Sequence, residues 1–123
     1  MSIFKRLHIS VGHAWDGLLL AFRQEFSFRI QVVAALAAGI FIFLFPLSRA
    51  ERSLIVLAIG SVLVLELLNS TIERFVDMVK PRVYEYARHV KDLSAAAVLV
   101  MTVTAVILAA IIFGPYLTSL ARL

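Results

Sequence analysis

Three long runs of apolar residues constrain the fold of this chain more than any other feature. Residues 30–48 and 93–121 carry no charge, and residues 53–72 carry only that of Glu66. A helix that spans a bilayer needs about 20 apolar residues, and a backbone in lipid must satisfy its own hydrogen bonds, which favours helices over open strands. We therefore predict an all-α membrane protein, a single domain over residues 1–123, with three transmembrane helices at about 30–48, 53–72 continuing to about 79, and 93–118.

The composition supports a membrane protein over a soluble one. The 123 residues are 62% hydrophobic, with a mean hydropathy of +0.96, whereas a small soluble protein buries only about 60–70% of its surface and would leave much of this apolar area in water. The net charge of +4 would also suit nucleic acid, but the basic residues flank the apolar runs, as in a membrane protein, so we expect no nucleic-acid partner. The absence of cysteine excludes disulfides and thiolate metal sites.

Residues 3–28 have the pattern of an amphipathic helix. Their apolar residues recur at spacings of three and four, and the charged residues fall mostly between them. We expect this helix to lie on the membrane surface, with Trp15 in the headgroup zone; packing of the helix against protein is the alternative. The apolar positions are Ile3, Leu7, Val11, Ala14, Leu18, Ala21 and Phe22.

The basic residues predict the orientation in the membrane. They are concentrated in the N-terminal segment and in the loop at 74–92, whereas the opposite side has only Arg49, Arg52 and Arg122. Because cytoplasmic segments are enriched in lysine and arginine, we expect the N-terminus and the 74–92 loop in the cytoplasm and the C-terminus outside. The cytoplasmic set is Lys5, Arg6, Arg23, Arg29, Arg74, Lys80, Arg82, Arg88 and Lys91.

Four polar residues mark one face of the second predicted span. Glu66, Asn69, Glu73 and Asp77 lie at positions i, i+3, i+7 and i+11, which on a helix fall within an arc of roughly 80° over about 16 Å. A charged group in hydrocarbon costs several kcal/mol and usually faces a bundle interior or a water-filled site. We interpret the face as a functional site; a structural pairing of Glu66 with a neighbouring helix is the alternative.

Phosphoryl transfer to a lipid is the chemistry that suits this face. Mg²⁺ is usually held by one or two carboxylates together with water and substrate phosphates, so Glu73 and Glu25 could share an ion at the interface. Glu66 lies deeper, where a lipid hydroxyl would be found, and could act as general base. Lys91 could neutralise charge on the transferring phosphoryl group, although a lysine at the end of a span is also a common interfacial anchor.

One absence and one alternative function bear on the interpretation as a kinase. The chain has neither GxxxxGK[ST] nor GxGxxG, so a kinase of this sequence must build its nucleotide site from helix side chains. A non-catalytic cation or proton pathway could also use an intramembrane Glu66. Glu25 and the Lys91-Asp92 pair favour the kinase over the pathway, because a Mg²⁺–nucleotide site needs such residues at the interface and a cation or proton pathway does not.

Two motifs resemble one known family. Residues 66–77, ELLNSTIERFVD, resemble the E-[IL]-[LV]-N-[ST]-x-[IL]-E-x-x-x-D signature of the prokaryotic diacylglycerol kinase and undecaprenol kinase family. Residues 91–99, KDLSAAAVL, resemble its second signature. The resemblance extends through Gly12, Trp15, Gly17 and Ala21 to Glu25, and so covers nearly the whole chain.

The resemblance implies a homotrimer in the bacterial cytoplasmic membrane, a trimeric helical bundle with composite active sites between subunits. It implies transfer of the γ-phosphate of ATP, with Mg²⁺, to diacylglycerol or undecaprenol, and it leaves the choice of acceptor open. Glu66 would be the general base, and Glu25 and Glu73 would hold the divalent ion. The residues implied around the nucleotide are Arg6, His13, Glu25, Asn69, Glu73, Asp77, Lys91 and Asp92, and those implied around the lipid are Ser10, Trp15, Ser27, Arg29, Glu66 and Ala95.

Overall fold

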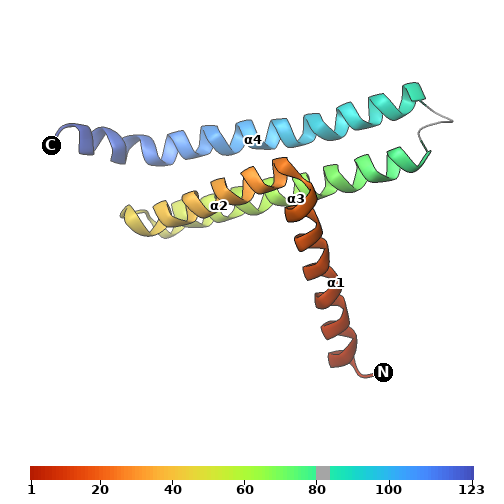
Figure 1. Ribbon diagram of the computed structural model, residues 1–123. Coiled ribbons are helices and arrows are strands. Elements are labelled where there is room, and N and C mark those ends of the chain that lie inside the picture. Colours follow the sequence, from red (N-terminus) through yellow and green to blue (C-terminus); the bar gives the residue numbers. More distant parts are fainter. Residues whose placement is uncertain (80–83) are drawn as a thin grey trace.

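The computed structural model describes residues 1–79 and 84–123, and this part of the chain is built from helices without a strand. Three of the helices, α2, α3 and α4, are long and apolar enough to cross a membrane. They run alongside one another, whereas α1 projects away from them at a steep angle (Figure 1). The all-α architecture with three spanning helices is therefore confirmed. The helices are α1 (Ile3–Gln24), α2 (Phe26–Leu44), α3 (Arg49–Val79) and α4 (Tyr84–Ala121).

The first helix is shorter than the 3–28 predicted, because the chain breaks at Glu25. The backbone of Glu25 is extended (φ −109°, ψ 107°), and the next helix begins at Phe26. The last carbonyls of a helix lack partners within it, and Arg29 Nη1 donates to the carbonyl oxygens of Phe22 and Arg23 at 3.1 and 2.9 Å. The break therefore depends on a side chain of the following helix, which helical periodicity does not reveal.

The connection between α2 and α3 also differs from the prediction that the first span reaches residue 48. Helix α2 ends at Leu44, two residues before Pro46, because a residue that precedes proline is disfavoured in helical conformation. Ser48 and Glu51 then form a capping box: the Glu51 N–H donates to Ser48 Oγ, and the Ser48 N–H donates to Glu51 Oε1, both at 3.1 Å. Helix α3 therefore starts from a defined cap rather than from the end of the apolar run.

The best packed part of the bundle lies at this same end. Residues from α2, α3 and α4 form an apolar cluster, and Phe45 and Phe113 meet edge to face with ring centroids 5.5 Å apart. Tyr116 of α4 hydrogen-bonds through its hydroxyl group to the Pro46 carbonyl oxygen at 3.3 Å and to Glu51 Oε1 at 3.2 Å. The buried members of the cluster are Ile42, Leu47, Ile55, Ile112 and Phe113.

Most of the predicted 74–92 loop is helical. Helix α3 continues to Val79 and α4 begins at Tyr84, well before the predicted span at 93–118. Lys80 and Arg82, which contributed to the orientation argument, lie outside the described residues. The helices extend past their apolar segments because a helix satisfies its own backbone in water as well as in lipid. Glu73, Asp77 and Lys91 therefore all lie on helices, the first two on α3 and Lys91 on α4.

Candidate active site

The packed face of α3 places Glu66 inside the bundle. Its buried residues Ile55, Ala58, Val62, Glu66 and Ser70 are spaced by three and four, the period of one helix face. The Glu66 side chain belongs to this face, and the residue is only 5% exposed. A carboxyl group at this position is costly in a membrane helix, so its placement on the packed face supports a functional role.

One turn along the same helix, Asn69 and Glu73 contact each other. Asn69 Nδ2 donates to Glu73 Oε1 at 3.4 Å, and both residues are half-buried. The amide oxygen Asn69 Oδ1 is buried and accepts no hydrogen bond within residues 1–79 and 84–123. Buried polar atoms nearly always have a partner, so this oxygen is a candidate contact for a bound ligand.

Asp77 and Lys91 join α3 to α4. Lys91 Nζ lies 2.6 Å from Asp77 Oδ1, and the charge of Glu73 also acts on Lys91. The ammonium group of the second motif is therefore held beside the acidic face of the first. Two motifs that are distant in sequence form one polar cluster.

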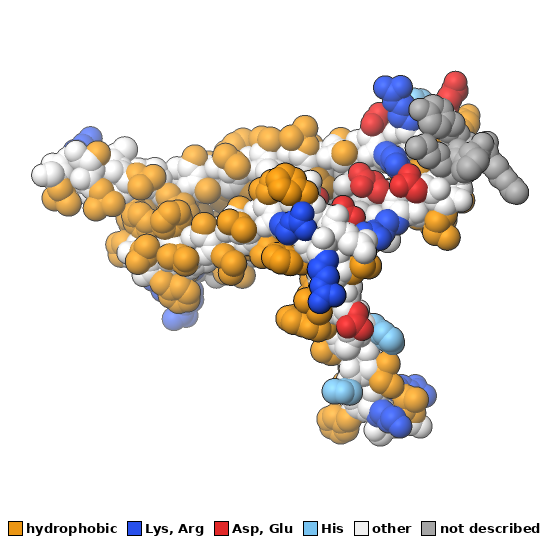
Figure 2. Space-filling model, in the orientation of Figure 1, with side chains coloured by type: hydrophobic (Ala, Val, Ile, Leu, Met, Phe, Trp, Pro, Cys, Tyr) orange, Lys and Arg blue, Asp and Glu red, His pale blue; other side chains and the backbone are white. Residues whose placement is uncertain are grey.

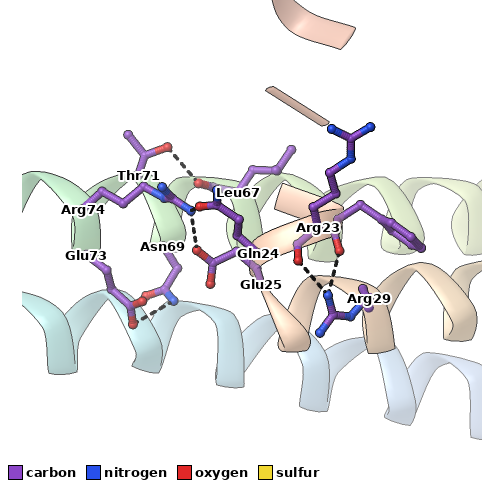
Figure 3. A network of polar contacts seen from close by, with 10 residues as sticks. Arg23, Gln24, Glu25, Arg29, Leu67, Asn69, Thr71, Glu73 and Arg74 are labelled. Atoms are coloured by element: carbon purple, nitrogen blue, oxygen red, sulfur yellow. Dashed lines mark hydrogen bonds and ion pairs between the residues drawn. The ribbon is translucent and has the colours of Figure 1, made fainter. Parts of the chain in front are cut away.

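Glu25 approaches this cluster from the break between α1 and α2. Arg74 Nη2 lies 3.0 Å from Glu25 Oε1 and 2.8 Å from Gln24 Oε1 (Figure 3). The charges of Glu25 and Glu73 both act on Glu66. Three carboxyl groups from two segments are thus brought into one neighbourhood, where acidic and basic side chains gather beside the largely apolar body of the bundle (Figure 2).

The other predicted site residues are not brought to this cluster within one chain. Four of them lie on α1, which projects away from the bundle (Figure 1). Arg29 instead caps α1, and the rest are exposed at the start of α2 or on α4. The exposed residues are Arg6, Ser10, His13 and Trp15 on α1, Ser27 on α2, and Asp92 and Ala95 on α4.

A groove of about 470 Å³ lies between α1 and α3, next to the cluster. Small residues of α1 and the hydroxyl residues of α3 line it, together with Leu67, Glu25 and Arg74. The lining includes Leu67, the residue that follows Glu66 in the chain, but not Glu66 itself. The small and hydroxyl residues are Ala14, Gly17, Ala21, Ser70 and Thr71.

The carboxylates suit Mg²⁺ better than a metal caged by protein alone. Within the described ranges, no three His, Cys, Asp or Glu side chains could hold one ion together. Mg²⁺ needs only one or two carboxylates when substrate phosphates and water complete its coordination. Glu25 and Glu73 would be the carboxylates of such a site, and the unpartnered Asn69 Oδ1 lies one turn before Glu73 on α3.

Comparison with known proteins identifies the family. The family model described as "Prokaryotic diacylglycerol kinase" matches residues 12–113, which include the whole polar cluster. The chain belongs to the prokaryotic diacylglycerol kinase family. As a member of this family it is an ATP-dependent membrane lipid kinase, and the alternative of a non-catalytic cation or proton pathway is not favoured.

Named relatives of this kinase differ in their acceptor lipid. The chain is 34% identical over 104 residues to the diacylglycerol kinase of Escherichia coli K12, with 85% of each chain covered. It is 38% identical over 112 residues to the undecaprenol kinase of Bacillus subtilis, with 91% of each covered. It is 37% identical over 111 residues to the diacylglycerol kinase of Pseudomonas aeruginosa, with 89% of this chain and 90% of the relative covered.

The structure adds two residues to the polar cluster that sequence reasoning missed. Arg74 had been interpreted only as a charge that sets orientation, and Gln24 not at all, yet Arg74 donates hydrogen bonds to both Gln24 and Glu25. The available signal was position: Arg74 directly follows Glu73, and Gln24 directly precedes Glu25. Neither position shows that the two side chains meet, because they are 50 residues apart.

Proposed function

We propose that this chain transfers the γ-phosphate of ATP, with Mg²⁺, to the hydroxyl group of diacylglycerol or undecaprenol. The observation that carries the proposal is the buried Glu66, on which the charges of Glu25 and Glu73 act. A buried carboxyl beside two interfacial carboxylates can serve a lipid hydroxyl and a water-soluble phosphate donor at one site. The products would be phosphatidic acid or undecaprenyl phosphate, with ADP.

Each residue of the cluster has a distinct part in this reaction. Glu66 accepts the proton of the lipid hydroxyl while the hydroxyl oxygen bonds to the γ-phosphorus and the bond to the bridging oxygen of ADP breaks. Glu25 and Glu73 would hold Mg²⁺, which when bound neutralises charge on the ATP phosphates. Lys91, held by Asp77 at 2.6 Å, faces the transferring phosphoryl group.

The remaining residues are proposed from the family pattern and from their positions. Asn69 supports the nucleotide through its unpartnered amide oxygen. The groove between α1 and α3 takes the lipid, whose hydroxyl then lies at Glu66. The other proposed nucleotide contacts are Arg6, His13, Asp77 and Asp92, and the other proposed lipid contacts are Ser10, Trp15, Ser27, Arg29 and Ala95.

We expect purified protein in detergent micelles with Mg²⁺ and ATP to phosphorylate one of the two lipids. Diacylglycerol and undecaprenol are supplied in parallel, and labelled phosphate in the lipid fraction is measured. The Glu66→Gln protein is the control for contaminating kinases. Formation of phosphatidic acid alone or of undecaprenyl phosphate alone assigns the acceptor. Absence of labelled product with both lipids would contradict the proposal.

The site faces the cytoplasm of a bacterial inner membrane in this proposal. The C-terminal end of α3 and the start of α4 lie at the same end of the bundle, and the junction of α1 with α2 lies partway along α3 (Figure 1). The cluster and the concentrated basic residues are at this end, and ATP is cytoplasmic. The positive-inside rule and the cytoplasmic location of ATP therefore indicate the same orientation. The N-terminus and residues 74–92 are cytoplasmic, and the C-terminus is outside.

The working form in this proposal is a homotrimer with shared sites. Helix α1 carries Arg6 and His13 away from its own α3 (Figure 1). These residues can serve a nucleotide only if α1 reaches the α3 of another copy. A cyclic trimer satisfies this condition at every site, because each chain gives its α1 to one neighbour and receives that of the other.

Mixing inactive chains tests the shared site. Glu66→Gln lacks the base, and Arg6→Glu places a repelling charge near the nucleotide phosphates. If the two residues of one site come from different chains, every trimer that contains both kinds of chain has both intact residues at one of its three sites, so the mixed assemblies should recover about one third of the wild-type activity. Activity is measured after co-expression of differently tagged chains and tandem purification. No recovery would show that one chain supplies both residues.

A further inference from the structure

Arg74 forms an ion pair with Glu25, and the reaction proposed above does not use it. Its Nη2 atom bridges Gln24 Oε1 at 2.8 Å and Glu25 Oε1 at 3.0 Å (Figure 3). The Glu25 side chain is 25% exposed and that of Arg74 is 46% exposed. The ion pair therefore lies at the edge of the cluster, accessible to ions from water.

The charge of this guanidinium has a specific consequence for the cluster. Glu25 and Glu73 both act on Glu66, so the three carboxyl groups repel one another when they are ionised. Arg74 offsets part of this negative charge by binding Glu25. A divalent ion on Glu25 would offset the same charge and would use the same carboxylate oxygens, so the guanidinium and the ion compete.

The ion pair between Arg74 and Glu25 can also be broken and formed again at little energetic cost. An exposed ion pair contributes little to stability, since solvent screens it. Arginine binds phosphate oxygens as readily as carboxylates. When a nucleotide brings both a divalent ion and phosphates, Arg74 can exchange its bond to Glu25 for one to a phosphate oxygen. A bare ion offers no such exchange.

We propose that Arg74 is a positioning residue that occupies Glu25 in the metal-free chain, disfavours binding of the bare divalent ion, and releases Glu25 when the ion arrives with nucleotide. The proposal rests on the assignment of Glu25 as a metal-binding carboxylate under the proposed function. It makes Arg74 a determinant of the order in which the site is filled. Its action is on metal affinity and not on proton transfer.

Binding of Mn²⁺ to purified protein in micelles, followed by electron paramagnetic resonance without nucleotide, tests this. Arg74→Gln should bind Mn²⁺ about tenfold more tightly than the wild type, the size of effect that one neighbouring opposite charge has on a carboxylate. Arg74→Lys keeps the charge and should stay close to the wild type. Arg23→Gln removes an arginine of the same junction whose side chain is exposed, and it should not change Mn²⁺ affinity.

Three further measurements separate this role from a structural one. Adding Glu25→Gln to Arg74→Gln should abolish the gain in Mn²⁺ affinity. In lipid phosphorylation, Arg74→Gln should raise the KM for ATP more than it lowers kcat. In the wild type, the side-chain N–H signal of Arg74 in nuclear magnetic resonance should shift when Mg²⁺ is added with a non-hydrolysable ATP analogue, and less with Mg²⁺ alone.

Unchanged or weaker Mn²⁺ binding by a folded Arg74→Gln protein would overturn the proposal. So would an Arg74 signal in the wild type that does not respond to the Mg²⁺–analogue complex, a test that needs no variant. Because Mn²⁺ binding requires no turnover, these results are independent of the lipid assay. A failed lipid assay combined with tighter Mn²⁺ binding by Arg74→Gln would contradict the lipid reaction and support the role of Arg74.

Discussion

The Glu66→Gln variant is expected to lose about 10²- to 10⁴-fold in kcat, the range that a general base contributes, while its affinity for nucleotide stays close to that of the wild type. Glutamine has nearly the same shape, so the packed face of α3 around Ile55, Val62 and Ser70 should be retained. What is lost is the ability to accept the proton of the lipid hydroxyl. Steady-state phosphorylation of the lipid and equilibrium binding of a fluorescent ATP analogue measure the two effects separately.

The same substitution at the far end of the same helix provides the control. Glu51→Gln changes a carboxylate that caps α3 through Ser48 and contacts Tyr116, far along the chain from Glu66. We expect it to keep turnover. If Glu66→Gln retained most of its kcat, or if it lost nucleotide binding in proportion to activity, the assignment of Glu66 as the base would be wrong.

Lys91→Ala is expected to lower kcat by about 100-fold or more, the loss seen when one group that stabilises transition-state charge is removed. Lys91 is held 2.6 Å from Asp77 and feels the charge of Glu73, so its ammonium group is already oriented toward the acidic face of α3. Single-turnover phosphorylation at saturating MgATP measures the chemical step without the contribution of nucleotide affinity.

Two companion variants show whether charge or anchoring matters. Lys91→Arg keeps the charge but not the compact shape of the ammonium group, so it should recover part of the rate. Arg88→Ala removes an exposed basic residue of the same helix and should leave the rate unchanged. A Lys91→Ala protein with near wild-type kcat would support the alternative that Lys91 is an interfacial anchor.

The helices and the acidic face were predictable because each depends on local periodicity. An apolar run of spanning length has few alternatives to a helix in lipid, and α2, α3 and α4 confirm this. On a helix, the spacing of Glu66, Asn69 and Glu73 determines that they share a face. The contact between Asn69 and Glu73 is therefore almost a property of the sequence alone.

The ends of the helices were less predictable because side chains from other segments decide them. The end of α1 at Gln24 depends on Arg29, which supplies hydrogen bonds to carbonyl groups of the preceding helix. Residues 26–28 fit an amphipathic helix equally well as a continuation of α1 or as the start of α2. The contact of Arg29 with α1 decides between these two arrangements. It joins two helices, so the residue pattern within either helix does not predict it.

The sequence by itself determined that this chain spans a membrane with three helices and carries an acidic face on the second of them. These properties depend on the transfer of apolar residues to lipid and on the helical period, and both can be calculated from residue order. Only the tertiary structure decided that Glu25 joins this face, that Lys91 is held by Asp77, and that Arg74 occupies Glu25. Such contacts join residues far apart in the chain, and they depend on the angle at the α1–α2 break and on the packing of α4 against α3.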